Sequence, residues 1–158
     1  MSKEYSGLTE LTFELTSLPK LLPIDFVSSK INDLVVNGYN VAPLLYGEFL
    51  LIPRIYLNLG VNNIAVNYSN QFNNDGLGCL SFIDTSGAGD TSKYYVYTQF
   101  EPYSAHRLIP CFDQPDLKAT LSLNIILPSD WISVANGPQN YTAVYDEIDY
   151  VKHAPSQN

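Results

Sequence analysis

The stretch Ile31 to Val41, "INDLVVNGYNV", contains the clearest signal for the fold. An Asn-Gly pair at positions 37 and 38 stands between two runs rich in β-branched and aromatic residues. Both central residues of a two-residue hairpin turn need positive φ, which Asn and Gly adopt with the least strain. The stretch therefore predicts two antiparallel strands joined by a tight turn.

Alternation of polar and apolar residues predicts further strands along the chain. Leu11 to Leu15, Ile64 to Tyr68 and Ala119 to Ile125 each place apolar side chains at every second position. This period is typical of strands that bury one face. Pro53 falls within Phe49 to Leu59, so we expect that segment to be split or to lie at a sheet edge.

Residues 70–90, "NQFNNDGLGCLSFIDTSGAGD", are rich in Gly, Asn and Asp and are predicted to form a long loop. A second Asn-Gly pair, at 136–137, closes the strand-like run 131–135. No segment shows a sustained helical period. We therefore expect an all-β fold of mostly antiparallel strands, saddle-like or sandwich-like, in one domain spanning residues 1–158.

Charge and composition exclude several classes of function. The formal net charge is −8, and the eight basic residues are scattered singly, which argues against nucleic-acid or anionic-membrane binding. The longest apolar stretch, 43–59, is interrupted by Glu48 and Arg54, so it does not predict a membrane span. Without an export signal at its start, the chain is expected to be cytoplasmic, with Cys79 and Cys111 reduced.

Residues 94–120, "YYVYTQFEPYSAHRLIPCFDQPDLKAT", concentrate the polar chemistry of the chain. A strand from Tyr94 to Glu101 would place Gln99 and Glu101 on one face, about 7 Å apart. An amide oxygen and a carboxylate so placed can hold an ammonium group through charge-assisted hydrogen bonds. The two faces of this strand are Tyr95, Tyr97, Gln99 and Glu101 on one side, and Tyr94, Val96, Thr98 and Phe100, suited to a core, on the other.

An alternative interpretation of the same residues is purely structural. Gln99 and Glu101 would then be solvated side chains on an exposed face, and Arg107 would pair with Asp113. Spacing by itself does not choose between the two interpretations.

The stretch also resembles the signature near the end of the N-terminal domain of aminopeptidase N-type zinc metallopeptidases, in a bacterial branch of the gluzincin aminopeptidase family. The segments "LTFEL", "VVNG", "LNLGVNNIAVNYS", "GLGCLSFID" and "WISVANGP" fit the same domain. The resemblance covers approximately residues 8–138 and leaves 139–158 as a tail leading toward a catalytic domain. The residues that carry it are Thr98-Gln99-Phe100-Glu101-Pro102, Ala105-His106-Arg107, Ile109-Pro110-Cys111-Phe112-Asp113-Gln114-Pro115 and Leu117-Lys118-Ala119-Thr120.

The resemblance implies specific roles for these residues. It implies a β-rich saddle packed against a thermolysin-like catalytic domain, in the same or a separate chain, with Gln99 and Glu101 binding the free α-amine of peptide N-termini. His106 stands where the family usually has Arg, a change that fits packing in a turn better than charge pairing. Structural roles in the motif are implied for Arg107, Pro110, Cys111, Phe112, Asp113, Pro115 and Lys118.

Zinc is expected in the complete family enzyme and not in this chain. The family binds zinc through His-Glu-x-x-His and a later Glu, whereas this chain has only His106 and His153, far apart. We therefore expect no catalytic or metal-ligating residue here, and no hydrolysis by this chain alone.

Two other functions stay open at this point. One is a free-standing β module that binds a protein partner through the face that otherwise meets the catalytic domain. The other is a carbohydrate-binding sandwich that stacks sugars on Tyr94, Tyr95, Tyr97 and Trp131.

Overall fold

The computed structural model describes residues 4–86, 92–145 and 148–155. Within these ranges the chain forms twelve strands and two short 3₁₀ turns, and the ladders between the strands are antiparallel. The all-β, antiparallel fold class expected from the sequence is confirmed. The chain forms two compact units, residues 1–114 and 115–158, and the single domain expected over residues 1–158 stays a prediction.

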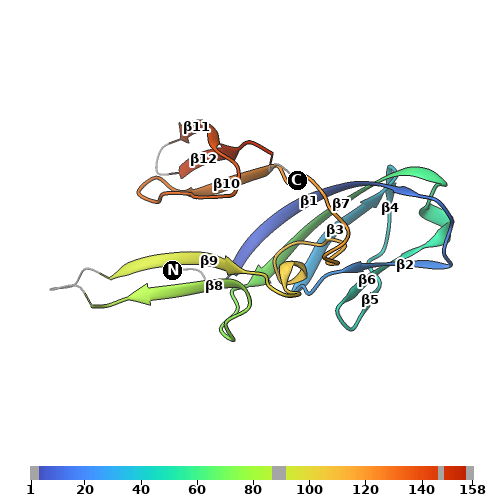
Figure 1. The fold of residues 1–158 in the computed structure, drawn as a ribbon, viewed down its shortest axis with the longest axis horizontal. Coiled ribbons are helices and arrows are strands. Elements are labelled where there is room, and N and C mark those ends of the chain that lie inside the picture. The colour runs from blue at the N-terminus through green and yellow to red at the C-terminus, as the bar shows by residue number, and fades with distance from the viewer. Residues whose placement is uncertain (1–3, 87–91, 146–147, 156–158) are drawn as a thin grey trace. The chain divides into compact units, whose positions relative to one another are not determined.

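The first sheet of unit 1 has the strand order β1-β7-β3-β4 (Figure 1). Asn37, with a φ of 50°, and Gly38, with a φ of 85°, form the predicted turn between its last two strands. The strands are β1 (Glu4–Leu15), β7 (Gly60–Gln71), β3 (Lys30–Val36) and β4 (Tyr39–Asn40).

The second sheet of unit 1 contains β2 (Leu21–Asp25), β6 (Phe49–Pro53) and β5 (Leu45–Tyr46), in that order. Pro53 ends β6 and a 3₁₀ turn, η1 (Arg54–Tyr56), follows, so this segment is split as expected. We did not predict β2, which holds a proline within its five residues and lies at the edge of this sheet, where proline is tolerated.

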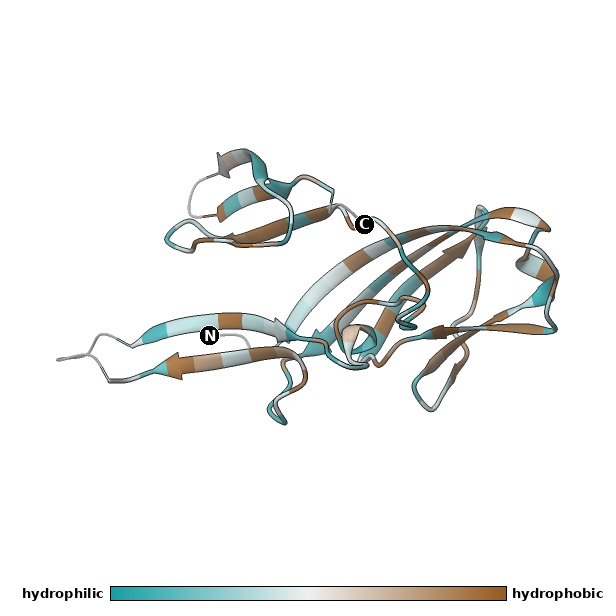
Figure 2. Ribbon diagram, viewed as in Figure 1, coloured by the Kyte–Doolittle hydropathy of each residue, from teal (hydrophilic) through white to brown (hydrophobic). Residues whose placement is uncertain are grey.

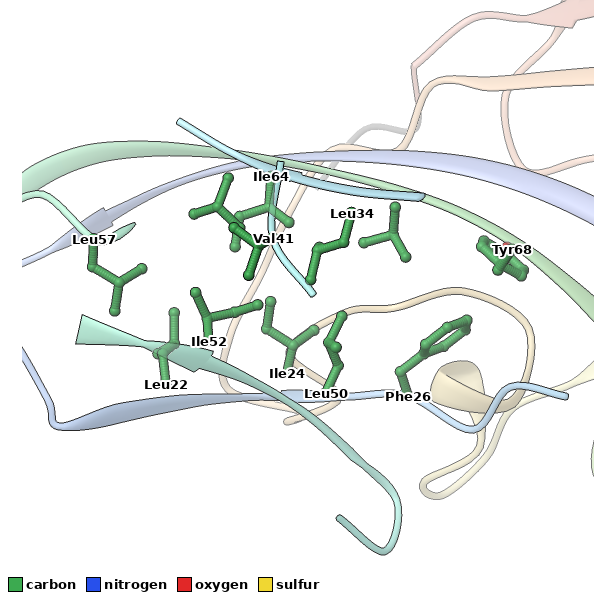
Figure 3. Close-up of a cluster of buried hydrophobic side chains, with 12 residues drawn as sticks. Leu22, Ile24, Phe26, Leu34, Val41, Leu50, Ile52, Leu57, Ile64 and Tyr68 are labelled. Carbon is green, nitrogen blue, oxygen red and sulfur yellow. The ribbon is translucent and has the colours of Figure 1, made fainter. Parts of the chain in front are cut away.

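The hydrophobic core of unit 1 lies between these two sheets. Figure 3 shows Ile64, Leu34 and Tyr68 of the first sheet pointing toward Leu22, Ile24, Leu50 and Ile52 of the second. The predicted inward alternation along β7 is confirmed, because Ile64, Val66 and Tyr68 are all buried. Burying each such side chain stabilises the fold by roughly 1.5–3 kcal/mol.

A two-stranded hairpin, β8 (Gly78–Asp84) with β9 (Lys93–Gln99), completes the strands of unit 1 (Figure 1). It corrects two predictions. Residues 70–90 are not one long loop, because β8 lies within them; residues 87–90 of that segment are outside the described ranges. The face of β9 expected to be buried is exposed, since β9 pairs only with β8 in the described part of the chain.

Unit 2 is a three-stranded sheet of order β10-β12-β11. Its strands are β10 (Leu123–Pro128), β11 (Gln139–Tyr145) and β12 (Ile148–His153). The segment 139–158, expected as a tail, thus holds two strands, although 146–147 and 156–158 lie outside the described residues. The predicted strand 119–125 begins only at Leu123, and the run 131–135 forms no strand.

Candidate functional site

Gln99 and Glu101 lie where the β8–β9 hairpin meets the rest of unit 1. Gln99 is the last residue of β9 and pairs with Gly78 across the ladder. Glu101 stands two residues beyond the strand, in a turn, and its peptide bond to Pro102 is cis. Both side chains are exposed. The predicted strand therefore ends two residues early, but both acceptors are open to solvent.

The loop after Glu101 is fixed to the second sheet by Tyr103. The hydroxyl of Tyr103 donates a hydrogen bond to Oδ1 of Asp25, at 2.5 Å. This carboxylate raises the pKa of the Tyr103 phenol. The ring of Tyr103 packs against the ring of His106, with 4.4 Å between their centroids. Asp25 is buried at the end of β2, so the loop is tied to the core of unit 1.

His106 is buried in the short 3₁₀ turn η2 (Ala105–Arg107) and pairs with Asp113. Its Nδ1 lies 2.8 Å from Oδ2 of Asp113, which also accepts the main-chain N–H of His106 at 3.1 Å. The Nε2 lies 3.9 Å from Oε1 of Glu48. The expected Arg107–Asp113 pair is therefore wrong: the partner of Asp113 is the neighbouring histidine, which was expected only to pack.

Arg107 instead holds the base of the hairpin. Its Nη1 donates to Oδ2 of Asp75 at 2.6 Å, and this bond lowers the pKa of the Asp75 carboxyl. Gly78 has a φ of 84°, and a Cβ atom there would lie 2.8 Å from the Cβ of Arg107. Only glycine fits this conformation and this contact. The start of β8 is thus packed directly on η2.

The remaining motif residues connect the loop to the strands around it. Main-chain groups of Cys111 and Asp25 exchange two hydrogen bonds, of 2.9 and 3.1 Å. Burial raises the pKa of the Cys111 thiol to about 12, with a smaller contribution from Asp113 and Asp25. Pro110 is fully buried, and Phe112 meets Phe13 of β1 edge to face at 5.0 Å. Pro115 and Lys118 belong to unit 2, where both are exposed.

The β8–β9 hairpin exposes apolar side chains on both faces. Because directly paired residues share a face, Phe82, Tyr95 and Tyr97 lie on the face of Gln99, and Ile83, Tyr94 and Val96 on the other. All six side chains are between 39% and 54% exposed. Figure 2 shows the hydrophobic colouring along β8. Two strands alone are marginally stable in water, and an exposed apolar patch of this kind marks a contact surface.

The described residues do not fit a zinc site. Within the described ranges no three His, Cys, Asp or Glu side chains come together in a group that could hold a metal ion. No helix in these ranges is long and apolar enough to cross a membrane.

The sequence did not point to Asp25 or Tyr103 as part of the site. They are 78 positions apart and come together only when β2 packs beside the loop. A tyrosine next to a proline, and an aspartate at the end of a short strand, carry no local signal for this contact.

The structure thus defines a β-rich domain in which Gln99 and Glu101 are exposed at the end of a hairpin. The family model described as the Peptidase M1 N-terminal domain matches residues 51–158. The chain is 41% identical over 113 residues to Aminopeptidase M1 of Arabidopsis thaliana, which covers 72% of this chain and 12% of that protein. It is also 28% identical over 136 residues to Aminopeptidase N of Streptomyces lividans. That alignment covers 85% of this chain and 15% of that protein.

This chain belongs to the Peptidase M1 N-terminal domain family. A match to Aminopeptidase N of Acetobacter pasteurianus has 34% identity over 79 residues, half of this chain and 22% of that protein. The chain thus spans between 12% and 22% of the length of these relatives.

Proposed function

We propose that this domain recognises the free α-amine of peptide substrates in an M1 aminopeptidase, through Gln99 and Glu101. The observation that carries the proposal is their placement: both are exposed, next to a loop that Tyr103 ties to the core. An α-ammonium group has three N–H donors and one positive charge. A carboxylate and an amide oxygen accept those donors, and Glu101 also supplies the opposite charge.

This recognition would distinguish a free N-terminus from a blocked or internal peptide bond. A neutral acyl group has no positive charge and fewer donors, so it would leave the Glu101 carboxylate desolvated without a partner. Sites built around a polar group reject analogues that lack it, because the polar atoms of the site then go unpaired.

The hydrolytic chemistry is proposed for a catalytic domain that docks on this one. In the proposal that domain supplies the zinc site, which the described residues of this chain do not provide. The exposed apolar faces of β8 and β9 supply a docking surface beside Gln99. Docking there would place the amine-binding residues at the edge of the catalytic cleft.

The test is steady-state kinetics of the complete M1 enzyme that carries this domain. Glu101→Gln removes the charge and keeps the shape. A lost charge-assisted hydrogen bond of about 1.5–3 kcal/mol corresponds to a fall of about 10- to 150-fold in kcat/KM for aminoacyl anilides. Glu14→Gln, on an exposed position of β1, is the matched control and should leave the kinetics unchanged.

Two results separate the proposal from its competitor. If Glu101→Gln stays within twofold of the parent enzyme, amine recognition is refuted and the free-standing interaction module is favoured. The 158-residue chain alone should neither hydrolyse these substrates nor retain stoichiometric zinc after dialysis.

A further inference from the structure

The chain is held at a fixed point on each side of Glu101. On one side, Gln99 is paired with Gly78 in the hairpin ladder, and Gly78 is packed on Arg107. On the other side, Tyr103 is bound to Asp25. Only three residues, 100–102, lie between Gln99 and Tyr103, and one of them is proline, whose ring restricts φ.

Asp25 is a rigid acceptor for the Tyr103 hydroxyl. Its side chain is 7% exposed, and both carboxylate oxygens are used: Oδ1 accepts from Tyr103, and Oδ2 accepts the main-chain N–H of Asp113 at 3.0 Å. Its own N–H and C=O are bonded to Cys111. Four hydrogen bonds therefore hold this one residue, so its carboxylate has a defined orientation.

The ring of Tyr103 makes a second, independent contact. It lies 4.4 Å from the ring of His106, at an interplanar angle of 37°. His106 is itself buried and bound to Asp113. A phenylalanine at position 103 would keep this ring contact and lose only the bond to Asp25.

We propose that Tyr103, through its hydrogen bond to Asp25, positions the Glu101 carboxylate for the substrate ammonium. Tyr103 is a positioning residue, because it acts through Glu101 and needs no contact with the substrate. The inference rests on the amine-recognition function proposed above. It adds a residue pair, Tyr103 and Asp25, that controls how well the site recognises an N-terminus.

The first experiment is Tyr103→Phe in the complete enzyme. A misplacement of about 1 Å at a binding group can lower efficiency up to about 100-fold, so we expect kcat/KM to fall about 10- to 100-fold. The fall should be mainly a rise in KM, because the ammonium is bound both before and during the reaction. Tyr46→Phe, at an exposed tyrosine of β5, is the matched control and should not change KM.

The second experiment is a double-mutant cycle with Glu101→Ala. If Tyr103 acts through Glu101, adding Tyr103→Phe to Glu101→Ala should lower kcat/KM by less than twofold further. An undiminished effect of Tyr103→Phe in that background would mean that the hydroxyl supports the fold generally, and would overturn the inference.

A rescue variant covers the case in which Tyr103→Phe is poorly folded. Replacing Tyr103 with 3-fluorotyrosine keeps the hydroxyl and the ring, and KM should return to within about twofold of the parent value. A KM that stays raised although the hydroxyl is present would overturn the inference.

The outcomes distinguish this inference from the function on which it rests. No effect of Glu101→Gln refutes amine recognition, and the positioning role with it. An effect of Glu101→Gln with unchanged KM in Tyr103→Phe leaves amine recognition standing and refutes only the role of Tyr103.

Discussion

Replacing Asn62 with alanine should strongly destabilise unit 1, because its side chain is the centre of a buried polar network. Asn62 is fully buried in β7. Its Oδ1 accepts from Nδ2 of Asn37 at 2.9 Å and from the N–H of Asn58 at 2.8 Å. Its Nδ2 donates to the carbonyl oxygens of Asn58 and Gly60, at 2.8 and 2.9 Å. Both N–H donors and both oxygen lone pairs of the amide are therefore in use.

The magnitude follows from counting these bonds. Four hydrogen bonds at about 1 kcal/mol each give a loss of about 4 kcal/mol, since alanine replaces none of them. A domain of this size is stable by about 5–15 kcal/mol in total, so the loss is a large fraction of its stability. The segment 57–63, which carries the chain from η1 into β7, should lose its defined conformation first.

The assay is urea unfolding of the 158-residue chain, followed by circular dichroism, because the single tryptophan, Trp131, belongs to unit 2 and its fluorescence would not report on unit 1. Asn63→Ala is the matched control: Asn63 is the next residue, faces solvent, and its side chain accepts a single bond from Thr12. We expect Asn63→Ala to lower the free energy of unfolding by less than about 1 kcal/mol. A free energy of unfolding for Asn62→Ala within about 1 kcal/mol of the control would refute the reasoning.

Two further predictions concern unit 1. Gly78→Ala should lower the thermal midpoint more than Gly76→Ala, because both glycines have positive φ but only Gly78 lies against Arg107; equal shifts would show that this contact is unimportant. Burial raises the pKa of Cys79 to about 11, and of Cys111 to about 12, so both thiols should react with iodoacetamide at pH 8 about 100-fold or more slowly than an unfolded thiol. Rapid alkylation of the native chain at pH 8 would contradict the raised thiol pKa values. Because each thiol has a higher pKa in the folded than in the unfolded chain, its contribution to the free energy of unfolding is complete below the unfolded pKa of about 9 and is lost as the pH rises through 11–12.

The parts of the fold that were predicted correctly depend on neighbours in the sequence. The turn at Asn37 and Gly38 needs only two residues that accept positive φ. The buried face of β7 follows from alternation over residues 64–68, where Asn67 is exposed and Ala65 is half-buried between the three buried side chains. Both signals are contained in a few consecutive positions, so they can be recognised in the sequence without knowing which strands pair with each other.

The strands that were missed have their signal in distant partners or in mixed composition. β8 holds the mostly apolar run 79–83, but asparagine and glycine before it, and aspartate, serine and glycine after it, gave the segment the composition of a loop. Its strand conformation comes from pairing with β9, and that partner is not visible in local composition. The core face expected for β9 was wrong for a related reason: alternation shows that two faces differ, and says nothing about which layer, if any, covers them.

The geometry expected for the candidate site was only partly correct, and the roles expected for its residues stay predictions. Gln99 lies in a strand as expected, although as its last residue, whereas Glu101, expected in the same strand, belongs to the turn that follows. Asp113 was assigned to Arg107 by charge, but the imidazole of His106 lies closer and its main-chain N–H reaches the same oxygen. Charge complementarity identifies possible partners, and the backbone path of η2 selects among them.

The contact between Asp25 and the loop at 103–113 has a consequence for where the domain can be cut. The match to the family model begins at residue 51, yet the aspartate that holds this loop stands well before it, on the first strand of the second sheet. A fragment starting at residue 51 would keep Gln99 and Glu101 but lose Asp25, to which the loop after them is bonded. The part of the chain that the family model matches is therefore shorter than the part that must fold together.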